Sequence, residues 1–273
     1  HSTMGEEKKS NYAMKAETKE EFIAQVTDGI PTPPLYFPIN ARINKEGYES
    51  LEQILKYGMK ALTISEFKKL KTDDTIILDT RNANQFTNGF VPGSVSIGLE
   101  GRFAEWAGSL LPFDAPILLV TDPGKEKETI VRLARVGFNQ VQGYLAGGIE
   151  AWKKEGEKTD MIINVEADEL MMDISHDKNL VVMDVRRETE FADGHLKDAI
   201  NLPLNEMNDP AKLADIEDHH NLYVHCAGGY RSVIASSILK REGFHNLRNI
   251  LGGWDKIKLE EKAEIVKETS VLN

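Results

Sequence analysis

The chain has 273 residues, 41% of them hydrophobic, and its 44 acidic residues outnumber its 33 basic residues, which gives a net charge of −11. This length allows two domains, and the hydrophobic content excludes disorder throughout. The acidic balance argues against non-specific binding of nucleic acid or an anionic membrane, because both need basic patches. No apolar run reaches the length of a membrane span, no segment resembles a signal peptide, and a single cysteine fits a reducing cytoplasm, where we expect the protein to reside.

The N-terminal stretch lies outside the pattern that fills the rest of the chain. Residues 18–29 have the spacing of a short amphipathic helix. Residues 30–40 contain four prolines, which are excluded from helix interiors. We therefore expect this second stretch to lie extended against a domain surface, held by Leu35, Tyr36 and Phe37.

The remainder of the chain repeats itself at an offset of 105 residues. Residues 76–99 align with 181–204, and after a one-residue gap Asp122 falls on Cys226. This pattern indicates one unit of about a hundred residues that is used twice. The predicted divisions are a tail with a linker at 1–57, a first domain without the cysteine at 58–158 and a second domain with the cysteine at 163–273.

The first unit begins with a predicted helix over 62–70. Thr63 stands three places before Glu66, which is the spacing of a capping box at a helix start. Further along, the charged stretch 124–128 is expected to be the solvated start of another helix.

The second unit alternates short apolar runs with helical patterns. The runs 180–184, 222–225 and 247–250 predict buried strands. Residues 231–243 have apolar side chains at helical spacing and end in Gly243, a typical helix stop. Strands and helices in alternation predict an α/β domain with a parallel sheet and helices on both faces.

The single cysteine, Cys226, lies between a predicted strand and a predicted helix, where ligands bind in folds of this kind. Gly228 and Gly229 allow the loop to curl so that several backbone N–H groups converge into an anion nest. Such a nest favours the thiolate, the reactive form of cysteine. Arg231 adds a positive charge that can orient an anionic donor or anchor the loop. The alternative is that Cys226 is a small buried side chain, the usual state of a lone cysteine.

Three motifs occur in order in the second unit, namely "DVRRETEFADGHLKDAINLPL", "CAGGYR" and "LGGW". They resemble rhodanese-type sulfurtransferases, whose active loop has the form C-x-x-G-x-R, over about 163–268. The first unit resembles the same family over about 60–158 through "LDTRNANQF", "VPGSVSI" and "LAGGIEAW", but Asp122 stands in place of the nucleophile. The resemblance implies two rhodanese-like α/β domains, each a mainly parallel five-stranded sheet with helices on both faces, of which only the second is active.

The resemblance also implies the reaction. A sulfane sulfur would move from thiosulfate or a low-molecular-weight persulfide to a thiol or other acceptor through a Cys226 persulfide, with no metal and no organic cofactor. The related phosphatases have one residue more in this loop, so phosphate-ester hydrolysis is disfavoured. Ala227 stands where members that favour thiosulfate often carry a basic residue, which leaves room for the persulfide of glutathione, bacillithiol or coenzyme A. The expected site residues are Cys226 and Arg231 as catalytic residues, Ala227, Gly228, Gly229 and Tyr230 in the persulfide-binding loop, and Asp184, Arg186 and Trp254 in support, with no metal ligand.

Several side chains near the loop have a structural interpretation beside a functional one. For Asp184 and Arg186 we expect a buried ion pair with Glu190 that fixes the first strand–helix turn. His225 lies on a predicted strand, where neighbouring side chains point to opposite faces, so we expect a structural role. Trp254 either lines the mouth of the pocket or belongs to the core.

A further resemblance covers the N-terminal stretch. The sequence "STMGEEKKSNYAMK", followed by "TKEEFIAQVTDGIPTPPLYFPINARINKEG", is similar to the C-terminal end of a metallo-β-lactamase-fold persulfide dioxygenase. Fusions of that domain to an inactive and then an active rhodanese domain are known, and the resemblance implies that the chain is the back portion of one. Its iron-binding motif, H-x-H-x-D-H, is absent, so we expect no dioxygenase activity. The alternative to a sulfurtransferase is a sulfur-carrier or interaction module that serves such a dioxygenase domain.

Overall fold

The computed structural model describes residues 2–27, 36–47, 49–214, 216–217 and 219–268. The chain divides into two compact units, a small one that includes residues 2–27 and a larger one that includes the described residues from 36 to 268. The small N-terminal unit holds the helices α1 (Met4–Ser10), η1 (Tyr12–Met14) and α2 (Lys19–Thr27), none of which has a buried residue. The amphipathic helix predicted from residue 18 is confirmed as far as Thr27, and the end of that prediction lies outside the described residues.

The larger unit, which contains both sequence repeats, begins with α3 (Tyr36–Glu46), where the sequence predicted an extended segment. The prediction was wrong from Tyr36 onward because Pro38 lies in the first turn of the helix, where backbone N–H groups have no intrahelical partner to lose. The expected contact with a domain surface is present, since the Tyr36 ring covers Gly108 and leaves no room there for a side chain. Leu35 and the residues before it lie outside the described residues.

The first five-stranded sheet has the order β1-β5-β4-β2-β3, and every neighbouring pair is parallel. Its strands are β1 (Ala61–Leu62), β2 (Ile76–Asp79), β3 (Ser94–Ser96), β4 (Ile117–Val120) and β5 (Val141–Leu145). Its helices are α4 (Leu51–Gly58), α5 (Ile64–Leu70), α6 (Ala83–Thr87), α7 (Phe103–Leu110), α8 (Glu126–Ala134) and α9 (Gly148–Lys154). The core residues of α5 and α9 pack on one face, and those of α4, α7 and α8 pack on the other.

The second sheet repeats this arrangement with the order β6-β11-β10-β7-β9, again all parallel. Its strands are β6 (Ile163–Val165), β7 (Leu180–Asp184), β9 (Ile200–Asn201), β10 (Asn221–His225) and β11 (Leu247–Ile250). Its helical segments are α10 (Ala167–Ile174), α11 (Glu188–Ala192), η2 (Leu204–Glu206), α12 (Pro210–Leu213), α13 (Tyr230–Arg241) and α14 (Trp254–Ile257). A short antiparallel pair, β8 (His195–Leu196) with β12 (Ile265–Val266), stands apart from this sheet.

The predicted fold class is confirmed, with two α/β domains that each contain a parallel five-stranded sheet. The capping box at the start of α5 is formed, with Thr63 and Glu66 each accepting a hydrogen bond from the other's backbone N–H. The three strands predicted in the second sequence repeat are β7, β10 and β11. The helix predicted after the cysteine loop is α13, which begins one residue earlier than expected and is followed by Gly243 at a φ of 100°.

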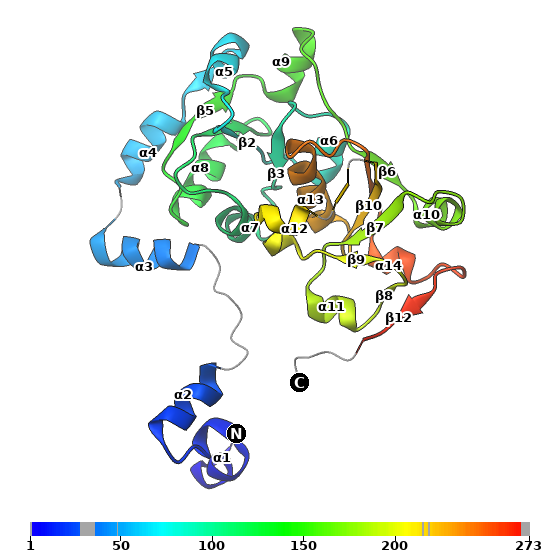
Figure 1. The fold of residues 1–273 in the computed structure, drawn as a ribbon. Helices are drawn as coiled ribbons and strands as arrows, with labels where there is room; N and C mark the ends of the chain where they lie inside the picture. Colours follow the sequence, from blue (N-terminus) through cyan, green and yellow to red (C-terminus); the bar gives the residue numbers. More distant parts are fainter. Residues whose placement is uncertain (1, 28–35, 48, 215, 218, 269–273) are drawn as a thin grey trace. The chain divides into compact units, whose positions relative to one another are not determined.

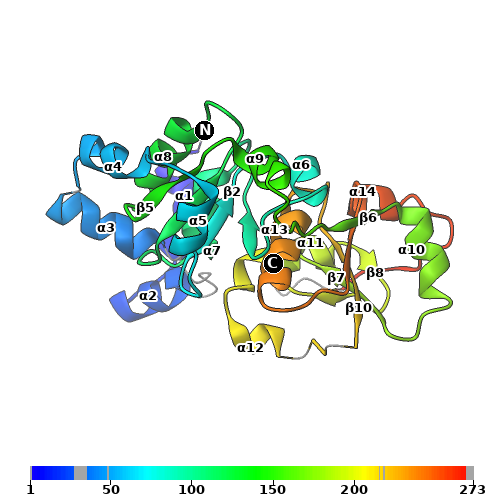
Figure 2. The same ribbon diagram turned by 90° about the horizontal axis from the view of Figure 1, so that it is seen from above.

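The helix α13 joins the two domains. Figure 1 and Figure 2 both show it beside β3, the edge strand of the first sheet. Six consecutive α13 residues from Ser232 to Ser237 are buried, so the helix is covered on all sides at this point. The backbone N–H of Ser96 on β3 donates to Ser237 Oγ at 2.9 Å. Buried apolar residues of both domains form one continuous cluster around this contact. The first domain thus covers the helix that begins in the cysteine loop.

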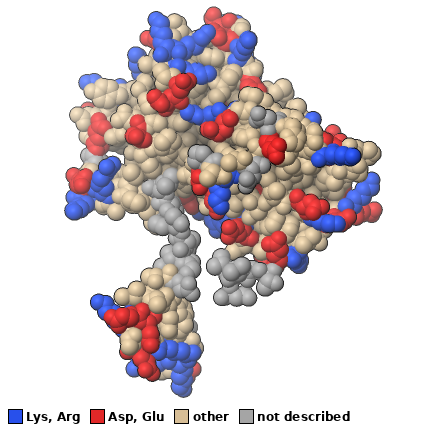
Figure 3. All heavy atoms as spheres, viewed as in Figure 1, with Lys and Arg blue, Asp and Glu red and all other residues tan. Residues whose placement is uncertain are grey.

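The surface carries charged side chains of both signs. On the face shown in Figure 3, acidic and basic side chains are intermingled. Within the described residues, no helix combines the length and the apolar character that crossing a membrane requires.

Candidate functional site

The cysteine loop curls around the sulfur atom of Cys226. This residue directly follows β10, and the loop passes through Gly229, at a φ of 104°, into α13. The backbone N–H of Gly229 donates to Cys226 Sγ at 3.1 Å, and Ser232 Oγ lies 3.6 Å from the same sulfur. A positive φ is open to glycine without a steric penalty, so the curl depends on this residue. The loop therefore offers the sulfur a donor at the N-terminus of a twelve-residue helix.

Cys226 is almost fully buried and yet borders a cavity. The residue is 1% exposed, as the alternative of a small buried side chain requires. It also lines an open cavity of about 570 Å³ together with Gly228, Tyr230 and Arg231 of its own loop. A reagent can therefore approach the loop from one side while the core holds the other.

Arg231 pairs with Glu190 of α11. Its two terminal nitrogens donate to the two carboxylate oxygens at 2.7 and 2.8 Å, a bidentate arrangement. The hydrogen bond from Arg231 holds the pKa of Glu190 below its ordinary value of 4.5, against the opposing effect of partial burial. The expectation that Arg186 pairs with Glu190 was wrong, because the carboxylate turns toward the loop and fastens Arg231 to α11.

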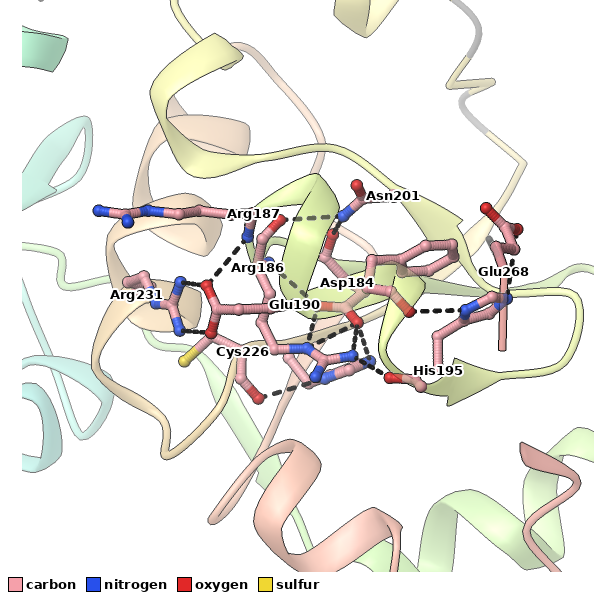
Figure 4. Close-up of polar contacts among 12 residues, drawn as sticks. Asp184, Arg186, Arg187, Glu190, His195, Asn201, Cys226, Arg231 and Glu268 are labelled. Atoms are coloured by element: carbon pink, nitrogen blue, oxygen red, sulfur yellow. Dashed lines mark hydrogen bonds and ion pairs between the residues drawn. The ribbon is translucent and has the colours of Figure 1, made fainter. Parts of the chain in front are cut away.

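Arg186 instead pairs with Asp184, as Figure 4 shows. The Arg186 Nη2 atom lies 2.6 Å from Asp184 Oδ2, and both side chains are buried. The same nitrogen donates to the carbonyl oxygen of Gly194 at 2.8 Å. The guanidinium also lies over the Trp254 ring, 4.6 Å from its centroid. The buried pair expected at the end of β7 is thus present, and it connects β7 to α14 rather than reaching the cavity.

His225 is fully buried one residue before the cysteine. Its Nδ1 atom lies 3.3 Å from the carbonyl oxygen of Cys226, and its Nε2 atom lies 3.8 Å from Asp184 Oδ2 without a hydrogen-bond partner among the described residues. Burial lowers the pKa of His225 below its ordinary value of 6.5 and outweighs the opposing charge of Asp184. The side chain contacts the backbone of the loop rather than the sulfur.

This burial predicts an acid-dependent loss of stability. Below about pH 6.5 the imidazole binds a proton in the unfolded chain but not yet in the folded one, so the free energy of unfolding should fall as the pH falls through this window. The slope for one proton is at most about 1.4 kcal/mol per pH unit. Denaturant unfolding at pH 7.5, 6.5 and 5.5 measures it, and His225→Gln should flatten it. An equal slope in both proteins would contradict the prediction.

The helix α14 holds the cysteine loop from behind. The backbone N–H of Trp254 donates to the Cys226 carbonyl oxygen at 2.7 Å, and that of Asp255 donates to the Ala227 carbonyl oxygen at 3.1 Å. Gly253 passes so close that a Cβ atom there would overlap the Cys226 carbonyl oxygen. Trp254 therefore acts on the loop through its backbone, while its partly buried ring packs in the core of the second domain and does not line the cavity.

The cavity has walls from both domains. Besides the loop residues, Arg187 and Glu190 border it from the second domain. Gly101, Arg102 and Trp106 border it from the segment around the start of α7 in the first domain. The sequence prediction missed Arg187, Gly101, Arg102 and Trp106, and it named Glu190 only as a structural ion-pair partner. The only available signal was the position of Arg187 and Glu190 inside the "DVRRETEF" motif, and no local pattern indicates that α7 lies near Cys226.

In a domain that is repeated along the chain, a cysteine follows the central strand of a parallel sheet and is itself followed by a glycine curl and a helix. The family of rhodanese-like domains matches residues 63–155 and 166–260, more than half of the chain. The chain belongs to the rhodanese-like domain family.

Two sulfurtransferases are similar to this rhodanese-like chain. Thiosulfate sulfurtransferase 16, chloroplastic, of Arabidopsis thaliana is 33% identical over 106 residues, covering 33% of this chain and 88% of that protein. A sulfurtransferase of Allochromatium vinosum is 25% identical over 93 residues, covering 34% of this chain and 85% of that protein.

Two solved structures are also similar, each with less than half of its length covered. A thiosulfate sulfurtransferase from Pseudomonas aeruginosa is 18% identical, with 78% of this chain and 44% of that chain covered and a TM-score of 0.35. A metallo-beta-lactamase from Staphylococcus aureus subsp. aureus COL is 23% identical, with 53% of this chain and 40% of that chain covered and a TM-score of 0.39. With TM-scores below 0.5, neither similarity supports a conclusion about function.

The first rhodanese-like domain repeats the scaffold of the second without its cysteine. Arg81 Nη2 lies 2.6 Å from Asp79 Oδ2 and donates to the Gly89 carbonyl oxygen at 2.9 Å, as the equivalent pair does in the second domain. The prediction that Asp122 stands in place of the cysteine was wrong by one residue: Val120 pairs with Asp79 as His225 pairs with Asp184, so Thr121 holds the place of Cys226. Asp122 lies one residue further on, and the Gln85 amide donates to its carboxylate at 3.1 Å. Neither the Thr121 hydroxyl nor the Asp122 carboxylate can accept a sulfur atom to form a persulfide. Across the described residues, no group of three or more histidine, cysteine or acidic side chains is placed to hold a metal.

Proposed function

We propose that the protein is a sulfurtransferase in which Cys226 carries the transferred sulfur as a persulfide. The observation that supports this most directly is the 3.1 Å hydrogen bond from the Gly229 N–H to Cys226 Sγ at the edge of a cavity. A donor in this position stabilises a negative charge on the sulfur, and a thiolate is the nucleophile that sulfur transfer needs. The similarity to two sulfurtransferases supports the same reaction class.

The reaction consists of two balanced displacements. The Cys226 thiolate attacks the outer sulfur of the donor, and the donor's S–S bond breaks with its electron pair leaving on a thiolate or, from thiosulfate, on sulfite. The outer sulfur is then bonded to Cys226 as a persulfide anion. An acceptor thiolate attacks this outer sulfur, the Cys226 S–S bond breaks, and the Cys226 thiolate returns. No external oxidant or reductant is consumed.

The other residues of the site position the nucleophile. Arg231, held by Glu190, fixes the end of the loop to α11, and Gly228, which has no side chain, borders the cavity beside Cys226. Ala227 and Gly229 are the loop residues outside this lining. The Asp184–Arg186 pair supports α14, which holds the loop from behind. In this proposal Tyr230 forms a wall of the cavity toward the first domain.

The proposal extends to the organisation of the chain. We assign residues 58–158 to the domain without the cysteine, residues 163–273 to the domain that carries it, and residues 1–57 to the tail and linker. The single reduced cysteine suits a reducing, cytoplasmic setting. A metallo-β-lactamase-fold persulfide dioxygenase domain remains the proposed partner of the N-terminal stretch, on the resemblance of that stretch alone.

Intact-protein mass spectrometry tests the function. After incubation with thiosulfate or glutathione persulfide, the protein should gain one sulfur atom, and cyanide should remove it. Turnover with excess donor and a free thiol should then continue for many cycles, whereas a sulfur carrier for a partner domain should stop after one sulfur. No gain of sulfur, with Cys226 shown to be reduced and open to alkylation, would refute the proposal.

A further inference from the structure

We infer that the first domain completes the donor site, and that Arg102 and Trp106 of that domain, with Arg187 of the second, select an extended anionic thiol persulfide. This inference rests on the proposed sulfurtransferase function and names the substrate class of that site. The relevant class is a persulfide whose thiol carries carboxylate or phosphate groups away from the sulfur.

The size of the cavity is the first argument. At about 570 Å³ it is far larger than a thiosulfate ion requires and lies within the range of roughly 300–1,000 Å³ typical of pockets for whole organic ligands. Cys226 borders it from the second domain, and Trp106 borders it from the first. A ligand that reaches from the sulfur to α7 must therefore be longer than the reacting group alone.

The charge of the lining is the second argument. Arg102, Arg187 and Arg231 line the cavity, and Glu190 is its single acidic lining residue among the described residues, although the chain as a whole is strongly acidic. Glu190 is occupied by Arg231, and Arg102 forms an ion pair with Glu105, which is outside the lining. Arg187 has no ion-pair partner among the described residues. In Figure 4 its side chain extends to the same side as Arg231 and the Cys226 sulfur.

The wall from the first domain is held in place, which is the third argument. The Tyr230 hydroxyl donates to the Gly98 carbonyl oxygen at 3.1 Å across the domain boundary. From α8, Arg132 donates to the carbonyl oxygens of Leu99 and Gly101. Burial raises the pKa of Tyr230 to about 12, so its hydroxyl keeps the proton that this bond requires. The segment that leads to Arg102 is therefore anchored to both domains before a ligand arrives.

The chemistry of the wall points to the ligand. Guanidinium groups bind carboxylate and phosphate groups with paired hydrogen bonds. Trp106 is partly buried and offers a flat apolar surface beside them. Carboxylates occur in glutathione persulfide and phosphates in coenzyme A persulfide, so these two donors share the recognised chemistry and form separate arms of the test.

The experiment compares donors in the full chain. Steady-state sulfur transfer to one acceptor is measured with glutathione persulfide, coenzyme A persulfide and the persulfide of mercaptoethanol, whose thiol carries no carboxylate or phosphate. Arg102→Gln and Arg187→Gln should each raise KM for at least one anionic donor about tenfold with kcat little changed, since a charge-assisted hydrogen bond contributes roughly 1.5–3 kcal/mol. Trp106→Ala should act in the same direction. All three should leave the mercaptoethanol donor within about twofold, and Arg135→Gln, an exposed arginine away from the cavity, should change nothing.

The outcomes separate this inference from the proposed function. Unchanged KM values for both glutathione persulfide and coenzyme A persulfide, or an equal loss with mercaptoethanol persulfide, would overturn the role of the wall while leaving sulfur transfer intact. If no donor loads Cys226 in the unmodified protein, the function itself fails. Calorimetric binding of S-methylglutathione, which cannot react, then still tests the wall, and a Kd unaffected by Arg102→Gln and Arg187→Gln would refute it.

Discussion

Cys226→Ser should lower the rate of sulfur transfer by roughly a thousandfold or more while the protein stays folded. A serine hydroxyl is not ionised near neutral pH and cannot hold the transferred sulfur in an S–S bond. The smaller oxygen still fits the buried position and can accept the Gly229 N–H, so the free energy of unfolding should change by no more than about 1 kcal/mol. Thiocyanate formation from cyanide and a persulfide donor measures the loss of transfer, and denaturant unfolding measures stability.

The matched control for this substitution lies in the other repeat. Thr121→Ser changes the equivalent position of the first domain, where no sulfur is expected to bind, and should leave transfer unchanged. Substantial transfer by Cys226→Ser would remove the cysteine from the mechanism. Equal losses in both variants would show that the effect arises from folding.

Gly253→Ala should reduce transfer about a hundredfold by displacing the loop. The added Cβ would overlap the Cys226 carbonyl oxygen and lie 2.8 Å from that of Ala227, and both are backbone atoms that cannot rotate away. The φ of 53° adds strain for any residue with a side chain. A shift of about 1 Å at a reacting atom can cost a hundredfold in rate. Steady-state kinetics and the yield of the Cys226 persulfide would both report the shift.

The repeat again supplies the control for this prediction. Gly148 is the equivalent glycine of the first domain, with a φ of 58°. A Cβ there would lie 3.2 Å from the Thr121 carbonyl oxygen, which a small movement relieves. Gly148→Ala should therefore cost about 1–3 kcal/mol of stability and leave transfer intact. If Gly253→Ala and Gly148→Ala had the same effect on transfer, the contact with the cysteine loop would not be responsible.

Local patterns in the sequence were enough to predict the main elements of the fold. The capping box of Thr63 and Glu66 placed α5, and the apolar runs placed β7, β10 and β11, because these signals depend on near neighbours. The helix over 36–46 was missed because Pro38 was treated as a helix breaker, whereas the first turn tolerates it.

The site was predictable only as far as it is local. The position of Cys226 before a glycine curl could be inferred from adjacent residues. The ion-pair partner of Glu190 could not be inferred from the sequence. Arg186 and Arg231 are both arginines within reach of the same turn, and only the fold decides between them. Arg102 and Trp106 come from the other repeat, and their place beside the cavity depends on how two domains pack, for which a single sequence carries no signal.

The burial of α13 against the first domain has an electrostatic consequence for the sulfur. The aligned peptide groups of this helix place a partial positive charge at its N-terminus, where the Gly229 N–H meets Cys226 Sγ. Water along the flank of a helix would screen this charge, but the six buried residues from Ser232 to Ser237 leave little room for water beside the first turns. The effective dielectric constant along this buried flank is therefore lower than in water, and the field of the helix is screened less on that side than on the side of the open cavity. Under the proposed function, the first domain thus strengthens the nucleophile of the second by excluding solvent from the side of α13.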